Sequence, residues 1–177
     1  MKGCPGKGLL FSAHGHLNIQ GYTYADWAGC LDDRRSTTGY FAYVGGNLVN
    51  WRSKKQGIVA RSTAEAEYRA MALGICELLW LRILMNELHL YDGSPLLLKC
   101  DSKAAIDITN NPVQHDRTKH IEIDRHFIKE KLDQGIICMP YVNSVNQLAD
   151  IFTKGIPDKL FSILCSKMGL YDAFVPS

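Results

Sequence analysis

The chain has 177 residues, 46% of them apolar, a length that suits one globular domain and excludes a second full one. Its formal net charge of +2 is too small to indicate nucleic-acid binding by composition alone, so such binding must depend on where the basic residues lie. No apolar stretch is long enough to cross a membrane and the first residues lack a signal-peptide core, so we expect neither a membrane span nor an export signal.

The first half of the chain predicts three antiparallel strands. Residues 17–27 alternate in the manner of a strand, and a polar turn follows at 30–38. Two β-rich runs, 39–44 and 48–53, flank Gly45-Gly46-Asn47, which is typical of a hairpin with a short glycine-containing loop. We therefore expect an antiparallel meander.

The second half predicts an α/β arrangement. Ser62 followed three residues later by Glu65 is a capping-box pattern, and it predicts a helix that runs to about Leu88. The next run, 96–100, is continuously apolar, as in a central strand buried on both faces. After this strand the pattern predicts a helix at 101–109, a second helix at 122–132 and a strand at 136–142. A further helix should begin near residue 146, and a terminal helix should span 157–170.

Helical periodicity separates the two glutamates near the start of the long helix. Glu67 shares a stripe with Met71, Gly74 and Leu78, whereas Glu65 lies about 200° around the helix from it. We therefore expect Glu67 to face the core and Glu65, as part of the cap, to face solvent. A buried carboxylate costs free energy unless it is paired or binds a cation, so Glu67 is a candidate functional residue.

Three further acids stand where a carboxylate could serve a site. Asp101 follows the apolar strand, at the edge where open α/β sheets bind ligands, although it could simply cap the next helix. Asp150 lies in the first turns of a predicted helix, where the helix dipole alone favours a negative charge. Asp26 is the only acid of the first strand, and it shares a face with Tyr24 about 6.6 Å away along the strand.

Six motifs are spread along the chain, within a resemblance that extends from Lys2 to about Leu170. They are GYTYADWAG at 21–29, DRRSTTGY at 33–40, WRSKKQ at 51–56, STAEAEY at 62–68, RTKHI at 117–121 and NQLADIFTK at 146–154. Together they resemble the ribonuclease H domain of copia-type LTR retrotransposon Pol polyproteins. The resemblance implies a ribonuclease H-like α/β fold: a mixed five-stranded sheet, three antiparallel strands and then parallel ones, with flanking helices.

The same resemblance implies a site of four acids in the order Asp, Glu, Asp, Asp. These positions correspond to Tyr24, Glu67, Asp101 and Asp150, so the first acid is replaced by tyrosine. In the family they hold two Mg²⁺ ions about 3.5 to 4 Å apart, which promote hydrolysis of the RNA strand of an RNA/DNA hybrid. A phenol, neutral near pH 7 and bulkier than a carboxylate, cannot replace the first ligand. We expect severely impaired hydrolysis, with Asp26 as a weak substitute at most.

Basic residues are placed where they could hold phosphates. Arg52, Lys54 and Lys55 end the third strand and Arg61 precedes the long helix, but such charges are also typical of a solvated hairpin end. The predicted nucleic-acid-binding set consists of Arg52, Lys54, Lys55, Arg61, Ser62, Arg117, Lys119 and His120. The histidines His115, His120 and His126 do not have the spacing of a zinc site, and they could equally pack the loop.

The resemblance also implies partners and boundaries. We expect an RNA/DNA hybrid and the reverse transcriptase part of the same polyprotein as partners, and a cytoplasmic virus-like particle as the location. Residues 1–16 would be a linker from the reverse transcriptase part, 17–155 the ribonuclease H-like domain and 156–177 a C-terminal helix and tail. The six cysteines show no CxxC pair, which predicts reduced thiols in an intracellular protein.

Two other functions fit part of the sequence. Integrases share this fold but place their glutamate after two aspartates, whereas Glu67 precedes Asp101, so the order of the acids argues against an integrase. A noncatalytic module that binds hybrids or acts as a scaffold would need the fold and the basic residues but not the four acids. The tyrosine at position 24 keeps this second alternative open.

Overall fold

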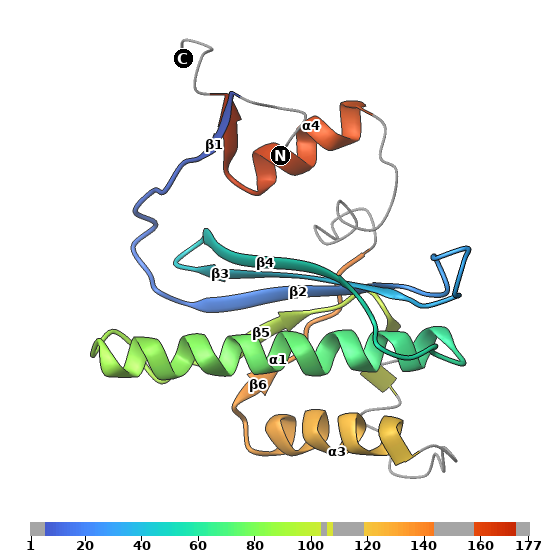
Figure 1. Cartoon of the computed structure of the whole chain (residues 1–177). Coiled ribbons are helices and arrows are strands. Elements are labelled where there is room, and N and C mark those ends of the chain that lie inside the picture. Colours follow the sequence, from blue (N-terminus) through green and yellow to red (C-terminus); the bar gives the residue numbers. More distant parts are fainter. Residues whose placement is uncertain (1–5, 104–105, 108–118, 144–157, 173–177) are drawn as a thin grey trace.

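The computed structural model describes residues 6–103, 106–107, 119–143 and 158–172, and the structural statements below concern these residues (Figure 1). The elements in chain order are β1 (Lys7–Leu9), β2 (Ile19–Asp26), β3 (Thr37–Val44), β4 (Asn47–Lys55), α1 (Thr63–Glu87), β5 (Leu96–Lys99), α3 (Lys119–Asp133), β6 (Ile137–Cys138), α4 (Asp158–Lys167) and β7 (Leu170–Asp172).

The central layer is a five-stranded sheet in the order β4-β3-β2-β5-β6. β2, β3 and β4 form an antiparallel meander, and β5 and β6 add to it in parallel. α1 and α3 lie against one face of the sheet, and α4 lies on the opposite side together with the small β1–β7 pair (Figure 1). The mixed sheet with flanking helices confirms the predicted fold class.

α1 packs unusually close to β2. Ser62 caps the helix, and its hydroxyl accepts a hydrogen bond from the backbone N–H of Glu65, as the capping pattern predicts. A Cβ added at Gly74 would lie 2.4 Å from Cγ2 of Thr23, and one added at Gly21 would lie 3.1 Å from Leu78. The missing side chains of these two glycines allow the close approach of helix and strand.

The opposite face of the sheet is covered by segments from both ends of the chain. β1 and β7 pair antiparallel, with Lys7 opposite Asp172. A buried apolar cluster joins this pair and α4 to the sheet, and its buried members are Phe41, Tyr43, Leu48, Leu164, Cys165 and Met168. We call this face of the sheet the outer face and the one against α1 the inner face.

Several elements differ from the sequence prediction. The hairpin loop contains only Gly45 and Gly46, both with positive φ, because β4 begins at Asn47. The prediction that residues 96–100 are buried on both faces is wrong: Leu96, Leu98 and Cys100 are buried, but the side chains that alternate with them are half-exposed. The predicted helix from residue 146 lies outside the described residues.

The structure also bears on the cysteines and on the apolar character of the helices. The five described cysteines, Cys30, Cys76, Cys100, Cys138 and Cys165, are all free thiols. Among the helices that the structure describes, none combines the length and apolar character needed to span a bilayer.

Candidate active site at the carboxyl ends of β2 and β5

The central parallel strands bring two of the predicted site positions to one edge of the sheet. β2 and β5 pair in parallel, with Tyr22 opposite Lys99. Tyr24 comes two residues after Tyr22 in β2, and Asp101 comes two residues after Lys99, just beyond the end of β5. Tyr22 and Tyr24 pack against the apolar cluster of the outer face.

Glu67 reaches the same edge from the inner face. Its carboxylate is 3% exposed, and Oε1 accepts a hydrogen bond of 3.1 Å from the backbone N–H of Ala25, the residue after Tyr24. Burial, with a further contribution from the charge of Glu67, raises the pKa of the Cys100 thiol to about 12. Glu67 therefore faces the core as predicted, and it lies near the end of β5 where Asp101 follows Cys100.

Tyr24 is part of the packing of the outer face. Its half-buried side chain contacts the apolar cluster that α4 and the sheet share. The neighbouring aromatic ring, Tyr22, packs edge-on against Tyr43 and lies 4.9 Å from the ammonium of Lys99. Position 24 therefore contributes an aromatic side chain to the apolar packing of the outer face.

Asp26 lies on the same face of β2, but its side chain is directed elsewhere. A Cβ added at Gly29 would lie 1.8 Å from Oδ2 of Asp26, so the carboxylate is folded against the loop that leaves β2. This orientation, together with the offset from Tyr24, supports the expectation that Asp26 is at best a weak substitute for the missing acid.

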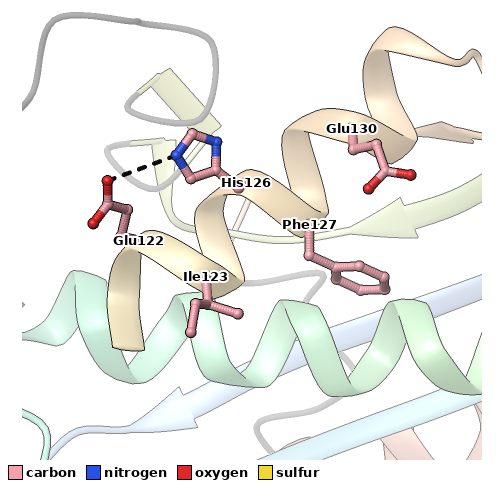
Figure 2. Close-up of a pocket in the computed structure, with 5 residues that line it drawn as sticks. All are labelled: Glu122, Ile123, His126, Phe127 and Glu130. Carbon is pink, nitrogen blue, oxygen red and sulfur yellow. Dashed lines mark ion pairs between the residues drawn. The ribbon is translucent and has the colours of Figure 1, made fainter. Parts of the chain in front are cut away.

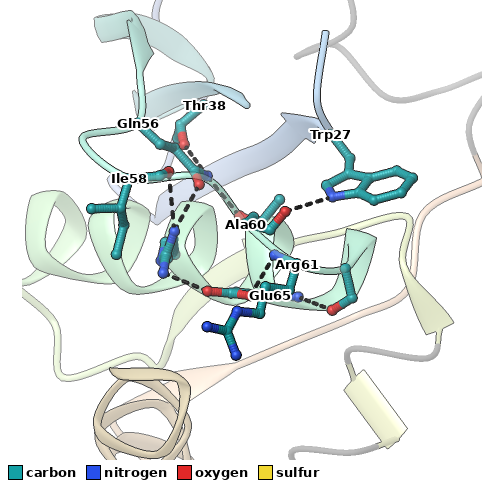
Figure 3. Close-up of polar contacts among 10 residues, drawn as sticks. Trp27, Thr38, Gln56, Ile58, Ala60, Arg61 and Glu65 are labelled. Atoms are coloured by element: carbon teal, nitrogen blue, oxygen red, sulfur yellow. Dashed lines mark hydrogen bonds and ion pairs between the residues drawn. The ribbon is translucent and has the colours of Figure 1, made fainter. Parts of the chain in front are cut away.

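The prediction that Glu65 faces solvent is wrong. Residues 56–61 fold back over the first turn of α1, and they leave Glu65 only 4% exposed (Figure 3). Its Oε2 accepts a 2.7 Å hydrogen bond from the backbone N–H of Arg61, and its Oε1 forms a 2.5 Å ion pair with Arg69. Helix phase alone could not reveal this, because the covering segment precedes the helix.

A second residue of this network was missed in the sequence. Gln56 is 7% exposed, and its Nε2 donates to Thr38 Oγ1 and to the Ala66 carbonyl, each at 3.0 Å. Arg69 donates to the Ile58 carbonyl at 3.4 Å. These contacts, seen in Figure 3, hold the start of α1 against the sheet. They thereby fix the position of Glu67 along β2.

The predicted basic residues of β4 lie in two places. Arg52 and Lys54 lie opposite Tyr40 and Thr38, on the inner face of the edge strand, where they help to line a groove of about 320 Å³ beside α1. Lys55 Nζ is engaged in the β2–β3 loop, 2.9 Å from Cys30 Sγ and 3.2 Å from Asp33.

The remaining predicted nucleic-acid contacts fall in different places. Arg61 and Ser62 are exposed just before α1, close to the carboxyl end of β2. Arg117 and His115 lie outside the described residues, whereas Lys119 and His120 begin α3. His126 is exposed on α3, and its Nε2 lies 3.8 Å from Glu122 in a shallow hollow of that helix (Figure 2).

The described donors were tested against a two-magnesium centre. Such a centre needs several carboxylates that converge on the ions. Within the described ranges no group of three or more His, Cys, Asp or Glu side chains could hold a metal ion, and Asp150 lies outside those ranges. Glu67 and Asp101 are the two carboxylates that remain, with a phenol at position 24. The ligand set Glu67, Asp101 and Asp150 therefore stays a prediction from the resemblance.

Sequence relatives cover nearly the whole chain. It is 39% identical over 170 residues to the retrovirus-related Pol polyprotein from transposon RE1 of Arabidopsis thaliana, a match over 96% of this chain and 12% of that protein. It is 36% identical over 171 residues to the corresponding polyprotein from transposon TNT 1-94 of Nicotiana tabacum, over 97% of this chain and 13% of that protein. No family model matches the chain. The chain therefore spans only a small part of these relatives.

The structure resembles a crystal structure of LC11-RNase H1 in complex with an RNA/DNA hybrid. The TM-score is 0.57 at 14% sequence identity, over 81% of this chain and 99% of that chain. At this identity the likeness establishes the fold. The chain is therefore homologous, over nearly its whole length, to one segment of the retrovirus-related Pol polyproteins of plant copia-type retrotransposons, and this segment has the ribonuclease H fold.

Proposed function

We propose that the domain acts on RNA/DNA hybrids in the manner of a ribonuclease H during reverse transcription, and that this chain hydrolyses the RNA strand at a strongly reduced rate. The observation that carries the proposal is the position of Tyr24. It stands at the carboxyl end of β2, next to the residue whose N–H holds Glu67, and β5, which precedes Asp101, is the parallel neighbour of β2.

The arrangement supports a site that lacks one carboxylate. Glu67 binds the backbone of the residue after Tyr24, and Asp101 follows the neighbouring strand, which is compatible with the four-acid order of the family. Tyrosine at that position is neutral near pH 7, with an ordinary pKa of about 10, and its ring is packed against apolar side chains. It offers neither the charge nor the short reach of an aspartate, so we derive no metal-dependent step for the chain as it stands.

The test restores the missing acid. A hybrid with a labelled RNA strand is incubated with Mg²⁺ and either the unmodified chain or Tyr24→Asp, with Tyr24→Asn as the matched uncharged control. A restored ligand contributes several kcal/mol of transition-state stabilisation, so we expect Tyr24→Asp to cleave at least about 100-fold faster. Tyr24→Asn should not gain activity.

A further substitution checks the assignment of the other acids. Asp101→Asn or Glu67→Gln, each introduced into Tyr24→Asp, should remove the restored cleavage, whereas Asp26→Asn should leave it within about twofold. Equal cleavage by the unmodified chain and Tyr24→Asp would contradict the role given to Tyr24.

The packing of Tyr24 also favours a second function, a noncatalytic module of the polyprotein that binds hybrids. A ring that contacts the outer-face cluster contributes to the fold without any chemistry. Hybrid binding by the unmodified chain, with no cleavage even by Tyr24→Asp, would favour this module over the impaired nuclease.

A further inference from the structure

Trp27 is a large apolar side chain held in the open at the candidate site. It is the first residue after β2, two positions beyond Ala25, whose N–H binds Glu67. The side chain is 46% exposed, although indole is among the most costly surfaces to leave in water. An exposed aromatic ring beside a functional edge of a sheet calls for an explanation that burial does not supply.

The ring is fixed in place. Its Nε1 donates a 3.0 Å hydrogen bond to the carbonyl of Ala60, which is buried. Ala60 belongs to the segment that the Gln56 and Arg69 contacts hold against α1, so the indole is anchored to a well-braced backbone (Figure 3). With its only polar group satisfied, the exposed part of the ring is apolar and pre-positioned, a combination that reduces the entropy lost on binding.

A cation follows the residue that anchors this ring. Arg61 comes directly after Ala60 and is exposed, and its backbone N–H is held by Glu65, while its side chain is directed away from the indole (Figure 3). Within the described parts of the chain its guanidinium forms no hydrogen bond or ion pair that would occupy it. A fixed apolar ring and an exposed guanidinium on one braced segment match separate sugar and phosphate positions along a nucleic-acid backbone.

We propose that Trp27 is a substrate-positioning contact. Its exposed face packs on the sugar surface in the minor groove of an RNA/DNA hybrid, and Arg61 meets a separate phosphate of the same backbone. This inference rests on the proposed function and names a residue that the four-acid pattern does not include. Its tryptophan counterpart on α1, Trp80, is 54% exposed but lies 13 residues beyond Glu67, about 20 Å along the helix.

The test measures binding without catalysis. Anisotropy of a labelled RNA/DNA hybrid in EDTA gives the Kd of the unmodified chain, Trp27→Ala, Trp27→Phe and the matched control Trp80→Ala. We expect Trp27→Ala to weaken binding by about tenfold, as the loss of one aromatic anchor does. Trp27→Phe keeps an apolar ring but loses the hydrogen bond to Ala60, so it should weaken binding clearly less than Trp27→Ala does. Trp80→Ala should bind as the unmodified chain does.

The comparison of Trp27→Phe with Trp27→Ala separates direct contact with the hybrid from a structural role of the indole. Trp27→Phe and Trp27→Ala both lose the bond to Ala60, so a purely structural role predicts that both weaken hybrid binding equally. That result, or unchanged binding by Trp27→Ala, would overturn the inference while leaving the proposed function intact. If the unmodified chain fails to bind the hybrid at all, both are overturned.

Discussion

β2 presents small side chains to α1 on its inner face and aromatic side chains to the terminal segments on its outer face. On the inner face, Gly21, Thr23 and Ala25 let the helix approach until a single added Cβ would clash. On the outer face, Tyr22 and Tyr24 pack at the border of the cluster that α4 and the sheet share. The inner face is set by backbone approach and tolerates little change, whereas the outer face has room for large aromatic side chains.

The largest effect is expected from breaking the inner face. Leu78 is 1% exposed and contacts the space left open by Gly21. Leu78→Ala should lower the free energy of unfolding by about 2 to 5 kcal/mol, because it removes buried methyl groups and leaves a cavity. Urea denaturation measures the change. Leu73→Ala, on the 47% exposed side of the same helix, is the control and should cost far less.

A smaller effect should follow from filling the gap between helix and strand. Gly74→Ala places a Cβ 2.4 Å from Cγ2 of Thr23, and the strain should exceed the gain in helix propensity by about 1 to 2 kcal/mol. Thr23→Ser removes that methyl group and should recover most of the loss in a double-mutant cycle. Additive effects of the two substitutions would mean that the contact is not the cause.

On the outer face, the substitution that should raise cleavage, Tyr24→Asp, should also lower stability. Tyr24→Asp removes an aromatic contact with the outer-face cluster, and it should lower the free energy of unfolding by about 1 kcal/mol. Hydrogen exchange should rise in the elements that form this cluster. Tyr24→Phe keeps the ring and removes only the hydroxyl, so the difference between Tyr24→Phe and Tyr24→Asp measures the contribution of the ring.

The smallest effect concerns a group outside both faces. Hydrogen bonds from Cys30 and from the Arg35 backbone, together with Lys55, hold the pKa of Asp33 at about 2, below its ordinary 3.8. A lowered pKa stabilises the folded state above the unfolded value, and this contribution is lost as the pH falls from about 4 towards 2. Asp33→Asn should therefore show a slightly flatter loss of stability in that window, measured as the urea midpoint against pH.

The sequence predicted those features of the fold and site that local pattern determines. The cap at Ser62, the inward face of Glu67 and the glycine hairpin each follow from spacing over a few residues. The burial of Glu65 did not follow, because it depends on residues 56–61 folding back over the helix. The bracing role of Gln56 was missed for the same reason, since its partners come from β3 and α1.

Pairing between segments far apart in the sequence could not be predicted either. β1 and β7 are three residues each, too short for periodicity to identify, and they pair only because the chain ends meet. The same limit applies to the positions that the four-acid pattern assigns. Parallel pairing brings β2, which carries position 24, beside β5, which precedes Asp101, but sequence spacing alone could not show that the tyrosine ring would find apolar neighbours on the outer face.

The pairing of Lys7 with Asp172 brings the first and last strands of the described chain side by side. A polypeptide that enters the domain through β1 leaves it through β7 at the same spot, so flanking segments would be tethered as if to a single point. Joining these ends with a short glycine linker and opening the chain at Gly45-Gly46 should therefore yield a circular permutant with the same sheet. In such a permutant the new chain ends would lie at the β3–β4 hairpin, so no flanking sequence would be attached beside β1 and β7.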